Sequence, residues 1–179
     1  YEIIDIQKRI AGNGSLGLDR YIILVEGNGS PDENYLLDFK ATRSSSLQPY
    51  LTVSQPQWET PSQRVVTIQQ RLQGTSPALL AAINDGDKSY VLRELQPAQD
   101  AVILQAWDGK LGRLEKLIQT MAEVTAWDQL RSSGRQGSAI ADELIDFGQS
   151  SEWHDYILEY AGNYAEKVNQ DFEEFRQSI

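Results

Sequence analysis

Two short runs of alternating and β-branched apolar residues lie near the start of the chain. They cover residues 21–26 (YIILVE) and 35–40 (YLLDFK). The segment between them, GNGSPDEN, consists of residues typical of turns. This pattern predicts an antiparallel hairpin with residues 27–34 as its loop, and the preceding YEIIDIQKRI predicts another strand.

The next elements are one helix and two further strands. Thr60 suits the N-cap of a helix, Pro61 its first position and Gly74 the position just past its end. The run ALLAAINDGDKSYVLREL then predicts two strands joined at Asp85-Gly86-Asp87. The fold class predicted from this order is α+β, with a small antiparallel sheet and one packed helix followed by an α-helical part.

The second half of the chain has helical periodicity. Two stripes of apolar residues recur at helical spacing, and we expect the second, aromatic stripe to be buried as core. The predicted parts are residues 1–97, containing the sheet, and residues 98–179, containing the helices. The stripes are Leu111, Leu114, Leu117, Ile118, Met121, Val124 and Leu130, and then Tyr156, Tyr160, Tyr164, Val168, Phe172 and Phe175.

Composition narrows the function classes. The 179 residues include no cysteine, which is compatible with a reducing cytoplasm, and no apolar run reaches the roughly 20 residues of a membrane span. The net charge of −10 argues against a nucleic-acid partner, which would require a basic face. The chain starts without methionine or a signal pattern, so we expect it to be a piece of a longer protein.

The tetrapeptide GNGS occurs twice, and its first copy carries the candidate chemistry. It belongs to GNGSLG, formed by Gly12, Asn13, Gly14, Ser15, Leu16 and Gly17, which fits the pattern G-x-G-x-x-G. In dinucleotide-binding folds this pattern leads into a helix, whereas here it leads into a predicted strand. The strand–loop–strand order is that of the protein-kinase glycine loop, which covers ATP phosphates. A simple glycine-rich bend is the alternative.

Two further segments follow in the order that a kinase lobe requires. Lys40 ends a predicted strand, where the kinase lysine holds phosphate oxygens. The segment ELQPAQD, with Glu94, Leu95 and Gln96, suits a hinge whose backbone receives adenine. The structural alternative for Lys40 is an exposed lysine at a strand end.

Other features oppose an intact kinase. Residues 63–73 contain no acid to pair with the lysine, and only Gln69 or Gln70 offers a neutral substitute. No H-R-D-x-x-x-x-N loop is present, and the single histidine, His154, lies in a helical segment. Asp146-Phe147-Gly148 spells the kinase magnesium motif but closes a helical run. We therefore interpret Gly148 as a helix C′ glycine and Phe147 as core, and assign no metal ligand to this chain.

Several blocks resemble an uncharacterised bacterial family, domain-of-unknown-function family 2252. They include YEIIDIQKRIAGNGSLGLDRYIILVEG, YLLDFKATRSSSLQPYL, SQRVVTIQQRLQG, SYVLRELQP and AWDQLRSSGRQG. The resemblance implies a kinase-like fold, similar to aminoglycoside phosphotransferases, in which the catalytic segment precedes the glycine-loop lobe. The catalytic base and magnesium ligands would then lie upstream of this chain. Family members often have HARSG where this chain has WDQLRSSG, so a role for that histidine is not carried over.

Two function classes follow. The first is the nucleotide-binding part of a kinase-like phosphotransferase, with ATP and Mg²⁺ as cofactors of the full-length protein and its upstream segment as partner. The second is a non-catalytic binding or regulatory module that keeps the lobe as a scaffold. In RSSGRQGS, Arg131 and Arg135 are either anion contacts or ordinary residues of an interhelical loop, with Arg131 as a helix C-terminal cation.

Overall fold

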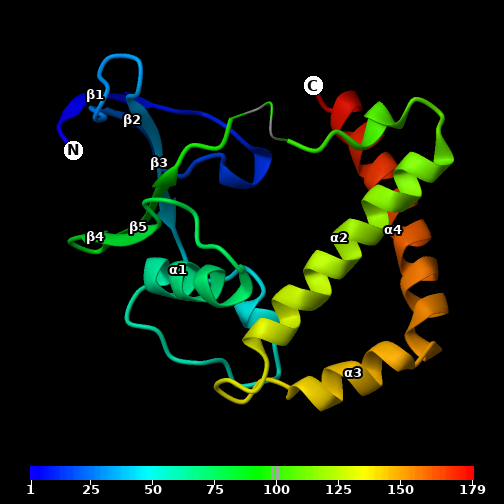
Figure 1. Ribbon diagram of the computed structural model, residues 1–179. Coiled ribbons are helices and arrows are strands. Elements are labelled where there is room, and N and C mark those ends of the chain that lie inside the picture. Colours follow the sequence, from blue (N-terminus) through cyan, green and yellow to red (C-terminus); the bar gives the residue numbers. More distant parts are fainter. Residues whose placement is uncertain (98, 100) are drawn as a thin grey trace. The chain divides into compact units, whose positions relative to one another are not determined.

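The computed structural model describes residues 1–97, 99 and 101–179 of the chain (Figure 1). These residues form two compact units, Tyr1–Ser132 and Ser133–Ile179. Among the described residues, none of the helices combines the length and apolar composition needed to cross a bilayer.

The first unit is built on a five-stranded antiparallel sheet in the order β1-β2-β3-β5-β4. The antiparallel pairing of β2 with β3 across residues 26–34 confirms the predicted hairpin. The turn at Asp85-Gly86-Asp87 is also confirmed, and Gly86 has a φ of +59° there. The strands are β1 (Ile3–Lys8), β2 (Arg20–Val25), β3 (Tyr35–Thr42), β4 (Ala81–Asp85) and β5 (Lys88–Glu94).

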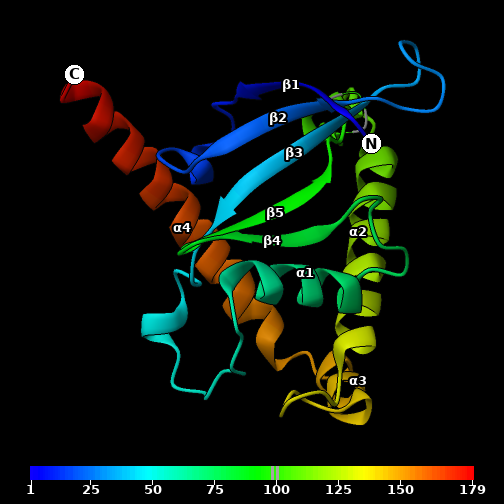
Figure 2. The ribbon, with the colours of Figure 1, turned by 90° about the vertical axis from the view of Figure 1, so that its left-hand side faces the viewer.

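Helix α1 (Pro61–Leu72) lies against one face of the sheet near β4 and β5, as Figure 2 shows. The hydroxyl of Thr60 accepts a hydrogen bond from the Gln63 N–H, which confirms the predicted N-cap. Ser62 is fully buried; its N–H donates to Ser89 Oγ at 2.8 Å and its hydroxyl to Asn84 Oδ1 at 3.3 Å. These bonds anchor the start of α1 to the sheet.

Helix α2 (Leu111–Ser132) packs against α1 and belongs to the first unit, although the sequence pattern placed it with the helical part that begins at residue 98. Arg131 in its last turn lies over the end of α1 and donates to the Leu72 carbonyl at 3.5 Å. A Cβ on Gly74 would meet this guanidinium at 2.9 Å. The glycine after α1 therefore makes room for Arg131.

The two faces of the sheet differ in chemistry. The face away from α1 carries Phe39 stacked on Tyr90 with ring centroids 4.4 Å apart, beside the buried Leu37. The face toward α1 carries a buried carboxylate, Asp38, which is only 2% exposed. Because neighbouring residues of a strand point to opposite faces, Lys40 lies on the same face as Asp38.

Asp38 is held by arginines from three other parts of the sheet. Arg20 on β2 donates from Nε at 2.6 Å and from Nη2 at 2.7 Å, a bidentate pair. Arg9, just after β1, has Nη1 3.9 Å from Oδ1, and Arg93 on β5 has Nε 3.8 Å from Oδ2. One carboxylate therefore links β1, β2, β3 and β5.

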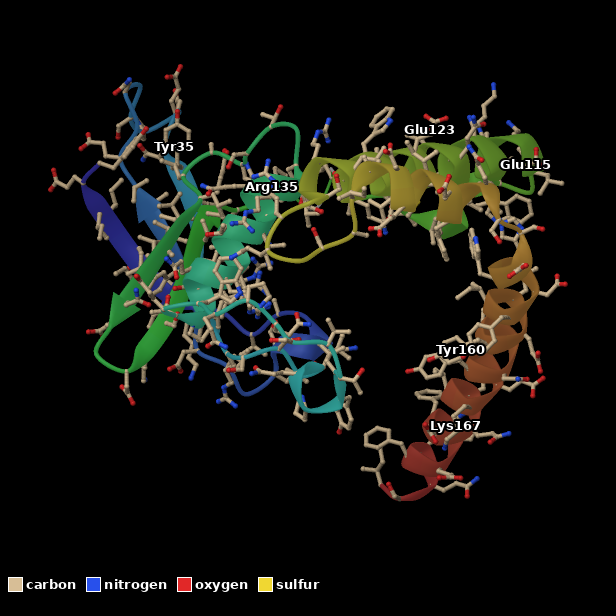
Figure 3. All side chains as sticks on the ribbon, turned by 90° about the horizontal axis from the view of Figure 1, so that it is seen from below. Tyr35, Glu115, Glu123, Arg135, Tyr160 and Lys167 are labelled. Atoms are coloured by element: carbon tan, nitrogen blue, oxygen red, sulfur yellow. The ribbon has the colours of Figure 1, made fainter. Side chains whose placement is uncertain are left out.

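The second unit contains α3 (Ala141–Gln149) and α4 (Glu152–Gln177). Trp153 joins them: its indole N–H donates to the Phe147 carbonyl at 3.3 Å, and its ring stacks on Phe147 at 5.4 Å. Figure 3 shows Tyr160 and Lys167 projecting from α4. Tyr160 stacks on Tyr164, with the ring centroids 5.8 Å apart.

Three expectations for the helical part are wrong in this structure. The aromatic stripe of α4 is exposed along its length, and Phe147 is exposed as well. Gly148 lies inside α3, and the C-cap of that helix is Ser150. Periodicity identifies the apolar face of a helix, but two helices of this unit offer no second layer to cover it. Asp146 and Phe147 do lie in a helix, as their setting predicted.

Removing the central carboxylate tests what holds the sheet. We expect Asp38→Ala to lower the free energy of unfolding by about 3–5 kcal/mol, because Arg20 would stay partly buried without its partner. Chemical denaturation followed by circular dichroism measures this change. The control is Asp19→Ala, which breaks a more exposed pair to Lys88 at 3.1 Å and should change little. Equal losses from both variants would contradict the role given to Asp38.

Candidate functional site

The predicted glycine loop forms the connection between β1 and β2. It contains one short 3-10 turn, Asn13–Ser15, and leads into a strand, which excludes the helix expected of a dinucleotide-binding loop. Arg20 donates from Nη1 to the Ala11 carbonyl at 3.1 Å. The arginine that holds Asp38 therefore also fixes the start of the loop.

The glycines of this loop have different reasons to be glycine. Gly12 and Gly17 have φ of +76° and +81°, a region that L-residues with a Cβ rarely adopt. Gly14 has no positive φ, and a Cβ built on it would meet no atom within 4 Å. Its N–H donates to no acceptor in the described part of the chain. Gly14 thus leaves open space and a free donor.

The second GNGS copy serves its turn. A Cβ on Gly27 would lie 1.8 Å from the Glu33 carbonyl oxygen, so only glycine permits this backbone approach. The Gly27 N–H also donates to Asn34 Oδ1 at 3.1 Å, and this hydrogen bond closes the loop. The second copy is therefore part of the turn, as its setting predicted, and the phosphate role of the first copy stays a prediction.

A cavity of about 470 Å³ brings the first loop and the predicted lysine together. Gly14 comes from the loop, Lys40 from β3, Gln69 from α1 and Arg93 from β5. Its size is within the usual range for small-molecule sites. The remaining lining residues are Leu18, Asp38, Ala41, Thr42, Arg43, Ser44, Ser46, Val65 and Val91.

Lys40 is one of the three cations that line this cavity. It is half-buried, and among the described residues its ammonium has neither a hydrogen-bond nor an ion-pair partner. Asp38 is on the same face but is held by Arg20. Helix α1 contributes Gln69, whose Nε2 donates to Gln73 Oε1 at 3.2 Å. This bond does not use the side-chain oxygen of Gln69, which can accept from another donor.

The segment predicted as a hinge is less available. The Glu94 N–H donates to the Ala78 carbonyl at 3.2 Å, and the Leu95 N–H to the Leu36 carbonyl at 2.8 Å. Neither residue lines the cavity, nor does Gln96. The predicted hinge segment ELQPAQD also includes residues 98 and 100 (Ala and Asp in the sequence), which lie outside the described residues.

The two arginines of RSSGRQGS belong to different units of the chain. Arg131 lies 3.6 Å from Asp128 Oδ1 and over the end of α1. Arg135 belongs to the second unit, where its N–H donates to Ser138 Oγ at 3.0 Å. Gly134 has a φ of +66°, as a residue just past a helix end often does.

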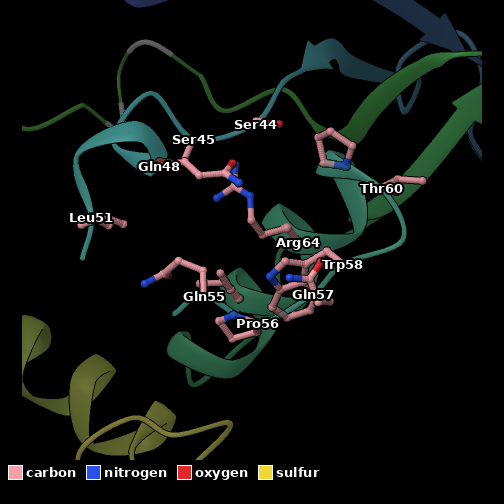
Figure 4. Close-up of a pocket in the computed structure, with 12 residues that line it drawn as sticks. Ser44, Ser45, Gln48, Leu51, Gln55, Pro56, Gln57, Trp58, Thr60 and Arg64 are labelled. Atoms are coloured by element: carbon pink, nitrogen blue, oxygen red, sulfur yellow. The ribbon is translucent and has the colours of Figure 1, made fainter. Parts of the chain in front are cut away.

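A second cavity, of about 280 Å³, lies between α1 and the irregular segment 43–60 (Figure 4). Gln48, Gln55, Trp58 and Arg64 project around it. Arg64 donates to the Arg43 carbonyl at 3.3 Å, so part of its guanidinium is already bound. Neither the glycine loop nor Lys40 reaches this cavity, and we place the candidate site in the larger one.

Sequence reasoning missed Arg9, Arg20 and Arg93 as neighbours of the site. Their positions depend on strand register, which pairs Asp38 with Arg93 and Lys40 with Arg20. The available signal was a charged residue, Asp38, inside an otherwise apolar strand. Among the described residues, no group of three or more His, Asp or Glu side chains is arranged to hold a metal.

Comparison with known proteins places the chain in a family. The family described as "Uncharacterized protein conserved in bacteria (DUF2252)" matches residues 1–178. The chain belongs to this family. No curated protein and no solved structure matches it, so the kinase-like arrangement implied for the DUF2252 family remains a proposal.

The two loop glycines allow a matched stability test. We expect Gly12→Ala to lower the free energy of unfolding by about 1–3 kcal/mol, because its positive φ would strain any side chain. Gly14→Ala should change it by only a few tenths, since its Cβ would enter open space. Urea denaturation of both variants measures the difference. A Gly14 variant as unstable as the Gly12 variant would show that the fold itself requires this glycine.

Proposed function

We propose that this chain is the nucleotide-binding part of a kinase-like phosphotransferase of the DUF2252 family. The observation that carries the proposal is the single cavity lined by Gly14 and Lys40. A glycine loop between two strands and a lysine on the third strand are the parts with which kinases hold ATP phosphates. In this proposal the catalytic base and the Mg²⁺ ligands come from outside the chain.

In this proposal, each of these residues has a role in binding phosphate. The Gly14 N–H and the open space above it allow phosphate oxygens to approach the backbone. Lys40 supplies a charge that no carboxylate among the described residues pairs with, and Ser44 and Ser46 add hydroxyl groups to the same cavity. The contact of adenine with the backbone of residues 94–96, which the sequence predicted, is not part of this proposal, because the Glu94 and Leu95 N–H groups already donate to carbonyls.

The alternative is a non-catalytic binding module, and one observation favours it. In kinases a glutamate on the helix pairs with the lysine. Here the α1 residues that line the cavity are Val65 and Gln69, and neither is charged. An intact Asp and Asn catalytic segment in the full-length protein, together with phosphate transfer from ATP, would favour the enzyme. ATP binding without any transfer would favour the module.

Calorimetric titration of ATP into the full-length protein tests the phosphate site. We expect Lys40→Ala to weaken binding roughly ten- to a hundred-fold, because a charge-assisted contact contributes about 1.5–3 kcal/mol. Gly14→Val should weaken it as well, because the added side chain fills the approach to the loop.

Two controls accompany this titration. Gly112→Ala lies in α2 in open space, and Gly29→Ala lies in the β2–β3 loop, where the Cβ would meet only the movable Glu33 side chain, at 2.6 Å. Both should leave ATP affinity nearly unchanged. If the full-length protein binds no nucleotide, or if Lys40→Ala binds ATP as tightly as the unmodified protein, the proposal is wrong.

A further inference from the structure

We propose that the Lys40 cavity recognises a chain of phosphate groups and makes no specific contact with a nucleobase. Its ligand class is then a polyphosphate, free or as part of any nucleoside triphosphate. The inference rests on the phosphate site proposed at Lys40 and adds Arg93 as a second ligand contact. It is carried by the charge balance, the unmet hydrogen bonds and the walls of the cavity.

The charge balance of the cavity is strongly positive. Lys40, Arg43 and Arg93 line it, and Asp38 is the acid among its described lining residues. Asp38 is already bound in bidentate form by Arg20. This local excess of cations stands in a chain whose net charge is −10, so it is not a reflection of overall composition.

The cations around Asp38 also keep unused hydrogen-bonding capacity. Arg9 and Arg93 approach its oxygens only to 3.9 Å and 3.8 Å, beyond hydrogen-bond distance. In the described part of the chain, the buried Nη1 of Arg9 finds no acceptor. Arg93 is 42% exposed and lines the cavity, so its guanidinium is free to bind oxygens of an incoming anion. Planar guanidinium groups bind phosphate well.

The residues that line the cavity provide few groups that could bind a nucleobase. Of the described lining residues none is aromatic, and Val91 is only 7% exposed. The N–H groups of Glu94 and Leu95, which would present an edge to adenine, donate to carbonyls of the chain. Ser44 and Ser46 add hydroxyl groups to the lining, whereas the Thr42 hydroxyl already donates to the Ser89 carbonyl at 3.1 Å. This lining fits phosphate oxygens better than a planar ring.

The test is calorimetry on the full-length protein with sodium tripolyphosphate, ATP, GTP and adenosine at one fixed ionic strength. We expect the three triphosphates to bind with dissociation constants within about threefold of one another, and adenosine to give no binding. Arg93→Gln should weaken all three triphosphates roughly ten- to a hundred-fold. Arg113→Gln, which removes an exposed arginine paired with Asp108 on the protein surface, is the matched control and should change nothing.

The outcomes separate this inference from the proposed function. If ATP binds more than tenfold tighter than tripolyphosphate, or if Arg93→Gln binds all ligands normally, the inference is wrong. The phosphate site still stands in that case, provided that Lys40→Ala weakens ATP. If no triphosphate binds, both are wrong. Denaturation midpoints of the variants, compared with the unmodified protein, show whether a loss reflects unfolding, and Arg93→Lys offers a milder second variant that keeps the charge.

Discussion

The buried carboxylate of Asp38 is the point at which four neighbouring strands are joined by charge. Arg20 approaches it from β2, Arg9 from the end of β1 and Arg93 from β5. A slip of one residue in β3 would turn Asp38 to the opposite face of the sheet, which carries Tyr90 of β5, and would separate it from Arg20 and Arg93. The cost of burying an unpaired carboxylate therefore fixes the register of the sheet.

The same ion pair positions the candidate site. Arg20 binds Asp38 with one side of its guanidinium and the Ala11 carbonyl with another, which ties the glycine loop to the centre of the sheet. Lys40 lies two residues beyond Asp38 on the same face. Loop and lysine are thus placed by one network, and a change that loosens Asp38 is expected to act on both.

Local signals were sufficient to predict the strands, the first helix and the turn role of the second GNGS copy. Turn residues, the Thr60 cap and the alternation in residues 21–26 and 35–40 each act within a few positions of the chain. The arginine cluster was not predictable in this way, because its members meet only through pairings between strands. The aromatic stripe of α4 failed for a related reason: the pattern of Tyr160 and Tyr164 defines an apolar face and says nothing of what covers it.

Lys40 and Asp38 show how one face of a sheet keeps a cation available beside an acid. The carboxylate is bound by Arg20 and approached by two further arginines, so it has little capacity left to neutralise the lysine. Helix α1 brings an amide, Gln69, where an acid would form a closed pair. A half-buried ammonium that pairs with none of the described residues is a cost to the fold, since it loses part of its hydration without gaining a hydrogen bond from them. A bound anion would offset that cost, and this links the charge balance of the sheet to the ligand class proposed for the cavity.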